Sequence, residues 1–409
     1  MLQEGRTSVT EAAPVLRRAA AMPPGETRAP LFAVPPTPLQ VEIAGADRVA
    51  ALGSAWRDLA RRAAEPNPFL HPGMVAAAAA AEKVVTVLAW AGSRLDGLWA
   101  LSTGRPASRL PIPVLRAPLH PLAFLSTPLL DGARPVEVMT AMLAALTATP
   151  ELPFLISAET FGAGGPAFAA LAAALAARGS APVILEESER PKLDVAAGGD
   201  PLAGMSASTR KKLRQHRRKL ESEGVVAVTR HEGADVATFL EEFLAIEARG
   251  WKGRRGTALA ADAAAAQFTR TAIGSLGEAG AASLMALRLN GQPLAMQVVL
   301  RAGAGAFTWK TAYDEDWARV SPGMLLFEDY TRAFMADETL RFADSCCYDA
   351  GGYMASAWGG RQQVVRVMFD LRPGRSSALA AAAGAEHAWL ALRGHAKRLY
   401  HRARALRPR

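Results

Sequence analysis

Apolar and polar residues follow the same order of elements in both halves of this chain. In the first half, the pattern predicts a strand over 39–43, helices over 47–62 and 74–82, and a hairpin of strands 84–90 and 95–102. In the second half, it predicts a strand over 225–229, helices over 235–249 and 262–276, and a hairpin of strands 282–289 and 294–300. Asn290-Gly291 between two apolar runs is a strong hairpin signal.

This repeated order predicts tandem α/β domains. Further strands are expected over 154–158, 182–186, 306–312, 340–344 and 364–369, and a further helix over 163–178. The expected boundaries are a disordered leader over 1–37, domains over 38–195 and 196–375, and a basic helical tail over 376–409. The alternative is that the order recurs by chance, as it can in any large α/β protein.

The most specific stretch begins where the strand over 306–312 ends. Ser321 is a suitable N-cap and Pro322 suits a first helical position, so a helix is expected to begin there. A helix start beside a strand end exposes free N–H groups and the positive end of a dipole. The sequence therefore predicts an anion-binding position, with phosphate as the favoured ligand.

The charge of the chain also points to an anionic partner. The 409 residues carry a formal charge of +9, which fits a nucleotide cofactor, RNA, a phosphorylated sugar or a membrane surface. The only cysteines, Cys346 and Cys347, are adjacent, so neither a structural disulfide nor a metal site is expected from them alone. No apolar run reaches the roughly 18 residues of a membrane span, and a cytoplasmic location is expected.

Two segments concentrate the positive charge. Residues 210–219 hold seven cations, and Arg210, Arg214 and Arg217 fall on one helical face. They form either a clamp for a phosphate-bearing substrate, such as a nucleotide-sugar, a lipid-linked sugar or tRNA, or a solvated helix. The tail over 393–409 carries seven arginines and lysines without an acid, and it suits either peripheral contact with anionic lipid or RNA, or a solubilising end.

Residues 200 to 345 resemble the GNAT acyltransferase superfamily, and within it the FemAB-like and CelD-like branch. The likeness rests on the basic helix 208–221, the hairpin 290–295, and the run from Tyr313-Asp314 through Ser321-Pro322-Gly323 to Asp344. The first half resembles the degenerate first domain of such proteins in plan. The chain departs from ordinary acetyl-CoA-using members because its loop over 319–323 keeps only one glycine.

The resemblance implies two tandem GNAT-like domains with mixed sheets flanked by helices. It also implies that strands 307–313 and 340–344 run parallel and splay apart, leaving a space for the pantetheine arm of acetyl-CoA or another acyl-CoA, with no metal. The phosphates would lie near Ser321, Gly323, Met324 and Leu325, with Arg319 as the charged partner. The reaction would be acyl transfer to an amine.

The attacking amine must be neutral, so a base is required. The candidates are Asp314, Glu315 and Asp344, and Tyr313 or Tyr348 could protonate the leaving thiolate. The alternatives are a solvated turn for the acids after Tyr313 and a packing role for Tyr348.

Three functions follow from this picture. The first is an N-acyltransferase that modifies an amino sugar or another amine, as in envelope or exopolysaccharide synthesis. The second is FemAB-like transfer of an aminoacyl group from charged tRNA. The third is a non-catalytic scaffold or regulatory protein with a decayed site.

Overall fold

The computed structural model describes residues 37–108, 110–347 and 352–405, with side chains to residue 396. Residues Pro38–Arg409 form one compact unit. The predicted leader lies outside the described residues, apart from Thr37. No helix in the described part of the chain has the length and apolarity to cross a bilayer.

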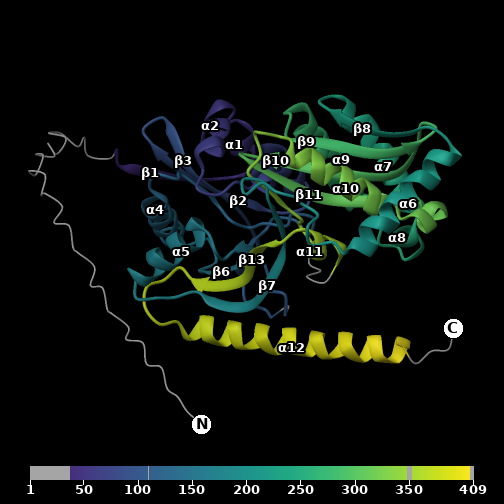
Figure 1. The fold of residues 1–409 in the computed structure, drawn as a ribbon. Helices are drawn as coiled ribbons and strands as arrows, with labels where there is room; N and C mark the ends of the chain where they lie inside the picture. Colours follow the sequence, from purple (N-terminus) through teal and green to yellow (C-terminus); the bar gives the residue numbers. More distant parts are fainter. Residues whose placement is uncertain (1–36, 109, 348–351, 406–409) are drawn as a thin grey trace, which may run out of the picture. The chain divides into compact units, whose positions relative to one another are not determined.

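A single mixed sheet runs through the described part of the chain, in the order β1-β2-β3-β4-β6-β13-β7-β12-β11-β10-β9-β8, with β5 also paired to β3 (Figure 1). The strands are β1 Leu39–Ala44, β2 Val84–Ala91, β3 Arg94–Gly104, β4 Val114–Ala117, β5 Leu129–Leu130, β6 Leu155–Gly162, β7 Val183–Asp194, β8 Val226–Glu232, β9 Ala282–Leu289, β10 Gln292–Ala302, β11 Gly305–Tyr313, β12 Phe342–Asp344 and β13 Gly360–Asp370.

Helices lie on both faces of this sheet (Figure 1). They are α1 Ala46–Ala50, α2 Ser54–Arg62, α3 Pro72–Ala79, α4 Pro135–Thr147, α5 Pro166–Ala176, α6 Ala207–Glu223, α7 Asp235–Arg249, α8 Trp251–Arg254, α9 Ala263–Glu278, α10 Pro322–Met335, α11 Tyr353–Ala357 and α12 Ser377–Ala405. The predicted class, a mixed α/β fold with helices flanking the sheet, is confirmed.

The two halves contribute matching runs of strands from opposite edges of the sheet. One run is β1-β2-β3-β4-β6-β13 and the other is β8-β9-β10-β11-β12-β7. Each run contains one parallel pair, β4 with β6 and β11 with β12. The central strands are exchanged, because β7 of the first half pairs with β12 and β13 of the second half pairs with β6. The domain boundaries expected from the sequence stay a prediction.

Local sequence explains most element ends. Asn290 and Gly291 have φ values of 50° and 83°, the left-handed pair that a two-residue hairpin turn requires. The helix predicted over 47–62 is instead two helices, because Gly53 has φ 51° and breaks the helical course between them. The strand predicted over 340–344 is shorter than expected and contains only Phe342–Asp344.

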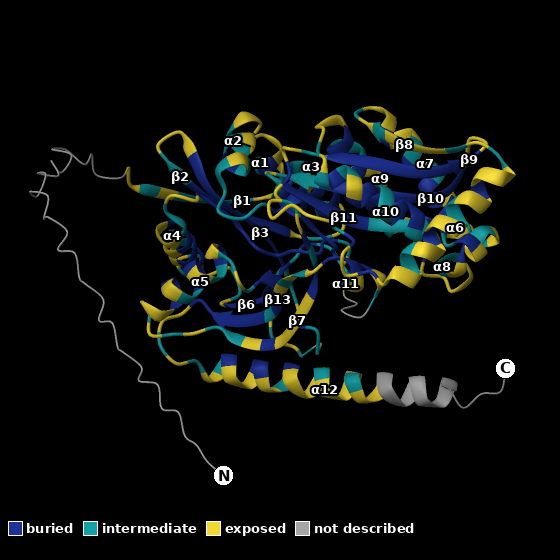
Figure 2. Cartoon of the chain, in the orientation of Figure 1, coloured by how far each residue is buried: buried dark blue, intermediate teal, exposed yellow. Residues whose placement is uncertain are grey.

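The halves also share an apolar core. One buried cluster includes Met74 of α3 and Phe268 of α9, which come from different halves. The two helices approach closely, since a Cβ added at Gly73 would lie 2.3 Å from Ser275 Oγ. Figure 2 shows the strands β9, β10 and β11 as largely buried and α6 as largely exposed.

Candidate active site

β11 and β12 are neighbours, as expected, but they pair over three residues only. The pairs are Gly305 with Phe342, Ala306 with Ala343, and Phe307 with Asp344. Trp309 is an extra residue in β11, because Thr308 lies opposite Val299 and Lys310 lies opposite Val298. A bulge of this kind bends a strand away from its neighbour. From Thr308 to Tyr313, β11 has no paired strand on the edge that faces β12 among the described residues.

A cavity of about 430 Å³, called the slot below, lies along this free edge. Thr308–Tyr313 of β11 form one side, and Ser345, Cys346 and Met354 form the side beyond β12. The region of α7 and α8 forms a third side, and Phe124 of the first half also lines the cavity. Arg190 binds both Phe124 O and Asp344, which lies opposite Phe307, so Phe124 is near the end of the slot remote from Tyr313. The free edge of β11 beyond its short pairing with β12 therefore borders an open cavity with polar groups in it.

Four charged residues line the slot: Glu247, Lys252, Lys310 and Glu315. Lys252 Nζ donates to Glu247 Oε1 at 2.7 Å and to Thr311 O at 3.2 Å. The amide of Leu259 donates to the other oxygen of Glu247 at 2.8 Å. Burial, and then the nearby Lys252, lower the pKa of Lys310 below its usual value. Lys310 is thus a half-buried amine that loses its proton more readily than an exposed lysine does.

A second hollow, of about 220 Å³, lies at the N-terminus of α10. It shares Thr311, Tyr313 and Tyr353 with the slot. Ser321 has φ 51°, and its side chain does not cap the helix. The amides of Met324 and Leu325 both donate to Ser321 O, at 2.9 and 3.2 Å.

Pro322 has no N–H, so the first turn of α10 offers an anion mainly the amide of Gly323. The expected contribution of the Met324 and Leu325 amides is therefore not seen. Arg319 is exposed, lies 4.8 Å over the Trp317 ring, and donates to Asp316 O at 3.3 Å. It lines neither the slot nor the hollow.

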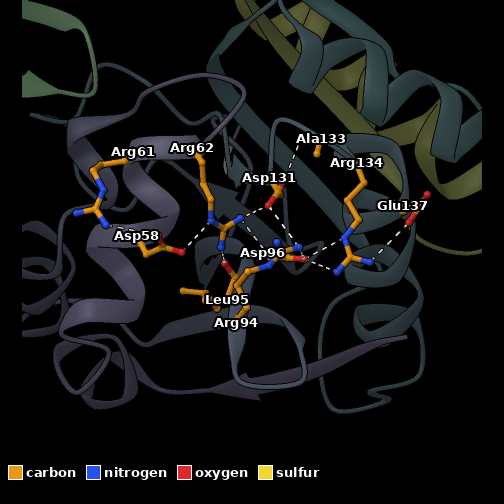
Figure 3. A network of polar contacts seen from close by, with 10 residues as sticks. All are labelled: Asp58, Arg61, Arg62, Arg94, Leu95, Asp96, Asp131, Ala133, Arg134 and Glu137. Atoms are coloured by element: carbon orange, nitrogen blue, oxygen red, sulfur yellow. Dashed lines mark hydrogen bonds and ion pairs between the residues drawn. The ribbon is translucent and has the colours of Figure 1, made fainter. Parts of the chain in front are cut away.

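The equivalent helix start in the first half is that of α4. A network of ion pairs between side chains of the first half surrounds it (Figure 3). Asp96 is fully buried and accepts from Arg94 at 2.8 and 3.0 Å and from Arg134 at 2.9 Å. Arg62 and Asp131 form a further ion pair beside them. Burial raises the pKa of Asp96, but the arginine hydrogen bonds outweigh this effect and the net pKa is lowered. Since an internal network neutralises this end of α4, the second half presents the more open helix start.

A comparison with protein families matches residues 207–353 to the model described as an acetyltransferase (GNAT) domain. This part of the chain is a GNAT acetyltransferase domain. Among curated proteins, no match to the chain is found.

Solved structures share the fold at low identity. The chain is similar to FemX, with a TM-score of 0.55, 10% identity, and coverage of 81% of this chain and 97% of FemX. A protein of unknown function from Bacteroides thetaiotaomicron VPI-5482 gives a TM-score of 0.52, 13% identity, and coverage of 79% and 97%. The C-terminal domain (DUF2156) of a proposed lysylphosphatidylglycerol synthetase from Agrobacterium fabrum gives 0.51, 13%, and coverage of 82% and 95%.

The family match confirms the resemblance to the GNAT superfamily for residues 207–353. The solved structures show that the fold of this chain is shared with FemX. Residues 207–353 thus form an acyltransferase domain of GNAT type.

The predicted acids of this GNAT domain do not meet at one point. Asp344 lies level with Phe307, and Asp314 lies seven residues further along, about 23 Å at the rise of a strand. Asp344 is 2% exposed and pairs with Arg190. Asp314 caps the turn Glu315–Val320 by accepting from the Asp316 amide at 3.0 Å. Neither placement supports a role as a free base.

The remaining predicted residues near the slot have mixed positions. Tyr313 lines both the slot and the hollow, and Tyr348 lies outside the described residues. Glu315 lines the slot, but its carboxylate pairs with Arg254, whose hydrogen bond lowers the pKa of Glu315. Burial raises the pKa of the Cys346 thiol, which disfavours the nucleophilic thiolate.

The predicted arginine clamp on α6 is largely engaged within the chain. Arg210 donates to Asp200 at 2.6 Å, and Arg217 donates to both carboxylate oxygens of Asp329 at 2.8 Å. Arg214 is exposed and has no recorded partner among the described residues. The three arginines therefore do not converge on one ligand in this structure.

Sequence reasoning missed Lys310, Lys252, Glu247 and Phe124. Lys310 left a signal, since it is the only charged residue within the otherwise apolar and hydroxylic strand β11. The other three come from distant segments, and only the fold brings them to the slot. Among the described residues, no group of three or more His, Cys, Asp or Glu side chains is arranged to hold a metal ion.

Proposed function

We propose that the slot takes the thioester arm of an acyl-CoA and that the enzyme transfers the acyl group to an amine. The observation that carries this proposal is that the slot and the hollow at the start of α10 are adjacent and share Thr311, Tyr313 and Tyr353 as lining residues. A phosphorylated end would lie at the Gly323 amide and the helix dipole, and the arm would lie along the free edge of β11. Acetyl-CoA is the simplest such donor.

In the transfer, the amine nitrogen attacks the thioester carbonyl carbon. A C–N bond forms and the C–S bond breaks, so coenzyme A leaves as a thiolate. Lys310 in its neutral form accepts the proton that the amine loses. Burial and the charge of Lys252 lower the pKa of Lys310, and the charge of Glu247 opposes this effect. Tyr313 borders both cavities and donates a proton to the leaving thiolate.

The acceptor would enter beside α7 and α8, where Glu247, Glu315 and Trp251 line the slot. The transfer reaction requires an acceptor that carries an amine. An amino sugar is one such acceptor, and envelope or exopolysaccharide synthesis is the setting suggested by the family resemblance.

Ligand binding tests the proposal directly. Isothermal titration with coenzyme A and acetyl-CoA should give saturable binding, and both ligands should raise the melting temperature. Thiol release from acetyl-CoA, measured against a panel of amino sugars and polyamines, should identify the acceptor class. Absence of binding by both coenzyme A and acetyl-CoA would overturn the proposal.

A second candidate is transfer of an aminoacyl group from charged tRNA. It is favoured by the fold shared with FemX and by an exposed cationic surface on α6. That surface, called the α6 surface below, contains Lys211, Lys212, Arg214, Arg218 and Lys219. α6 packs against α10 and the turn before it, so the α6 surface is on the same half of the chain as the slot. Salt-sensitive RNA binding without binding of coenzyme A would favour this candidate, and binding of neither ligand would favour a scaffold.

A further inference from the structure

We infer that the first half of the chain supplies the end wall of the acyl slot, and that Phe124 in this wall limits the donor to short acyl chains. The inference rests on the proposed acyl-CoA function. It assigns to the first half a part in substrate selection that the GNAT match over 207–353 does not include.

The wall consists of a segment inserted between β4 and β5 of the first half. β4 and β5 pair with the same strand, since Arg116 lies opposite Ser102 and Leu129 lies opposite Leu98. In the second half, the corresponding strand β11 continues with one bulged residue only. Residues 118–128 of the first half thus occupy the position that corresponds to the one-residue bulge in β11. They extend into the second half.

Two hydrogen bonds to backbone carbonyl groups hold this segment at the end of the slot. Trp309 Nε1, from the bulge itself, donates to Leu122 O at 2.7 Å. Arg190 Nη1 donates to Phe124 O at 2.7 Å, while its Nη2 binds Asp344 at 2.6 Å. Because both anchors are buried or half-buried, residues 122–124 form a fixed wall.

The ring of Phe124 fills the end of the slot. It is 6% exposed, its centroid lies 5.2 Å from Lys310 Nζ, and it packs edge-to-face on Phe69 at 6.0 Å. Phe69 packs in turn on Phe307 at 6.5 Å. Loss of the Phe124 ring would therefore extend the slot into an apolar cluster, which suits an alkyl chain.

The next residue provides a matched control. Leu125 is 7% exposed, nearly the same as Phe124, but it lines a separate cavity of about 360 Å³ together with Glu65 and Lys192. The chain at 124–125 is a partition between the two cavities. A change at Leu125 should disturb the same segment without lengthening the slot.

The test measures dissociation constants for acetyl-CoA, butyryl-CoA and octanoyl-CoA by isothermal titration. Wild type should bind acetyl-CoA best. Phe124→Ala should shift the ratio of octanoyl-CoA to acetyl-CoA affinity at least tenfold towards the long chain, since even one methylene group in an apolar pocket changes discrimination about tenfold or more. Phe124→Leu should give a smaller shift in the same direction, and Leu125→Ala should leave the ratio unchanged.

The outcomes separate the two proposals. If wild type binds no acyl-CoA, the proposed function and this inference both fail. If wild type binds acetyl-CoA but Phe124→Ala and Leu125→Ala have the same chain-length ratio as wild type, the proposed function stands and the inference fails. Phe124→Leu keeps the test decisive if Phe124→Ala does not fold.

Discussion

Arg190 and Asp344 form a buried ion pair, with Arg190 Nη2 and Asp344 Oδ2 2.6 Å apart and side-chain exposures of 2% and 3%. The pair joins β7, the last strand of the first half in sequence, to β12 of the second half. Asp344 Oδ1 also accepts from the Cys346 amide at 2.9 Å. Both carboxylate oxygens are thus engaged, and the pair fixes the edge of the slot where β12 ends.

Asp344→Asn should therefore lower the free energy of unfolding by about 3–5 kcal/mol, because it leaves the Arg190 guanidinium buried without its counter-charge. Denaturant unfolding of the variant and of wild type measures this loss. The double variant Arg190→Met, Asp344→Leu should recover part of it, since neither charge then remains buried. An Asp344→Asn protein with wild-type stability and no turnover would instead identify Asp344 as a base.

Lys310→Met should reduce kcat/KM by about 10²–10⁴-fold, the usual contribution of a positioned base. The pKa of Lys310 is lowered from 10.5, so its neutral fraction rises with pH and passes one half below pH 10.5. For wild type, kcat/KM should rise with pH with a midpoint below pH 10.5, and the Lys310→Met profile should lack this limb.

Lys310→Arg is the control for charge, since it keeps a cation that does not titrate in this range. It should be as slow as Lys310→Met. Wild-type activity that falls as pH rises would show that the ammonium form is needed, which contradicts the proposed role.

Gly323→Ala should weaken binding of coenzyme A while slightly stabilising the fold. A Cβ at Gly323 would meet only Tyr313 Cδ1, at 3.9 Å, so the methyl group fits the protein but occupies the hollow at the helix start. Replacement of a helical glycine by alanine contributes roughly 0.5–1 kcal/mol of stability.

Gly274→Ala in α9 is a matched variant, because a Cβ there meets nothing within 4 Å and lies away from the slot. It should give a similar rise in the melting temperature with unchanged affinity for coenzyme A. Equal affinities for both variants, measured by titration, would exclude Gly323 from the phosphate position.

The sequence predicted the parts of the fold that depend on local pattern. β9 and α7 have the expected bounds, and β10 extends two residues beyond its prediction at each end, because turn residues and apolar spacing determine these elements over short distances. The exchange of β7 and β13 was not predicted, since strand pairing between residues far apart in the chain leaves no local pattern.

In the candidate site too, features set by local sequence were predicted and features set by distant residues were not. The strand end, the helix start and the adjacency of β11 and β12 followed from the sequence and the family resemblance. The role of Asp344 did not, because its partner Arg190 lies 154 residues away. Phe124 was equally hidden, since residues 118–128 carry no sign that they cross to the second half.

His71 should make stability fall on acidification between pH 6.5 and about 4. Burial lowers the pKa of His71 to about 4, and its Nδ1 accepts from the Gly73 amide at 3.1 Å to cap α3. Below pH 6.5 the unfolded chain binds a proton that the folded protein does not take up until about pH 4, so unfolding is favoured in this window. The full effect corresponds to about 3 kcal/mol.

His71→Asn keeps an N-cap acceptor and removes the titration. Unfolding free energies measured at pH 7 and pH 4.5 should differ less for this variant than for wild type. Identical pH dependence in the two proteins would show that His71 is already protonated in the fold.

The α6 surface decides whether RNA is a substrate. Lys211, Arg214 and Arg218 are exposed and unpaired among the described residues, so the triple change to glutamate should leave the melting temperature nearly unchanged. If tRNA binds there, the change should weaken binding and reduce the slope of log affinity against log salt by about one for each lost phosphate contact. A control with glutamate at Arg57, Arg61 and Lys83 makes the same change in net charge on the first half. Equal losses in the two triple variants would mean that RNA responds only to total charge, and the aminoacyl-tRNA candidate would lose its structural support.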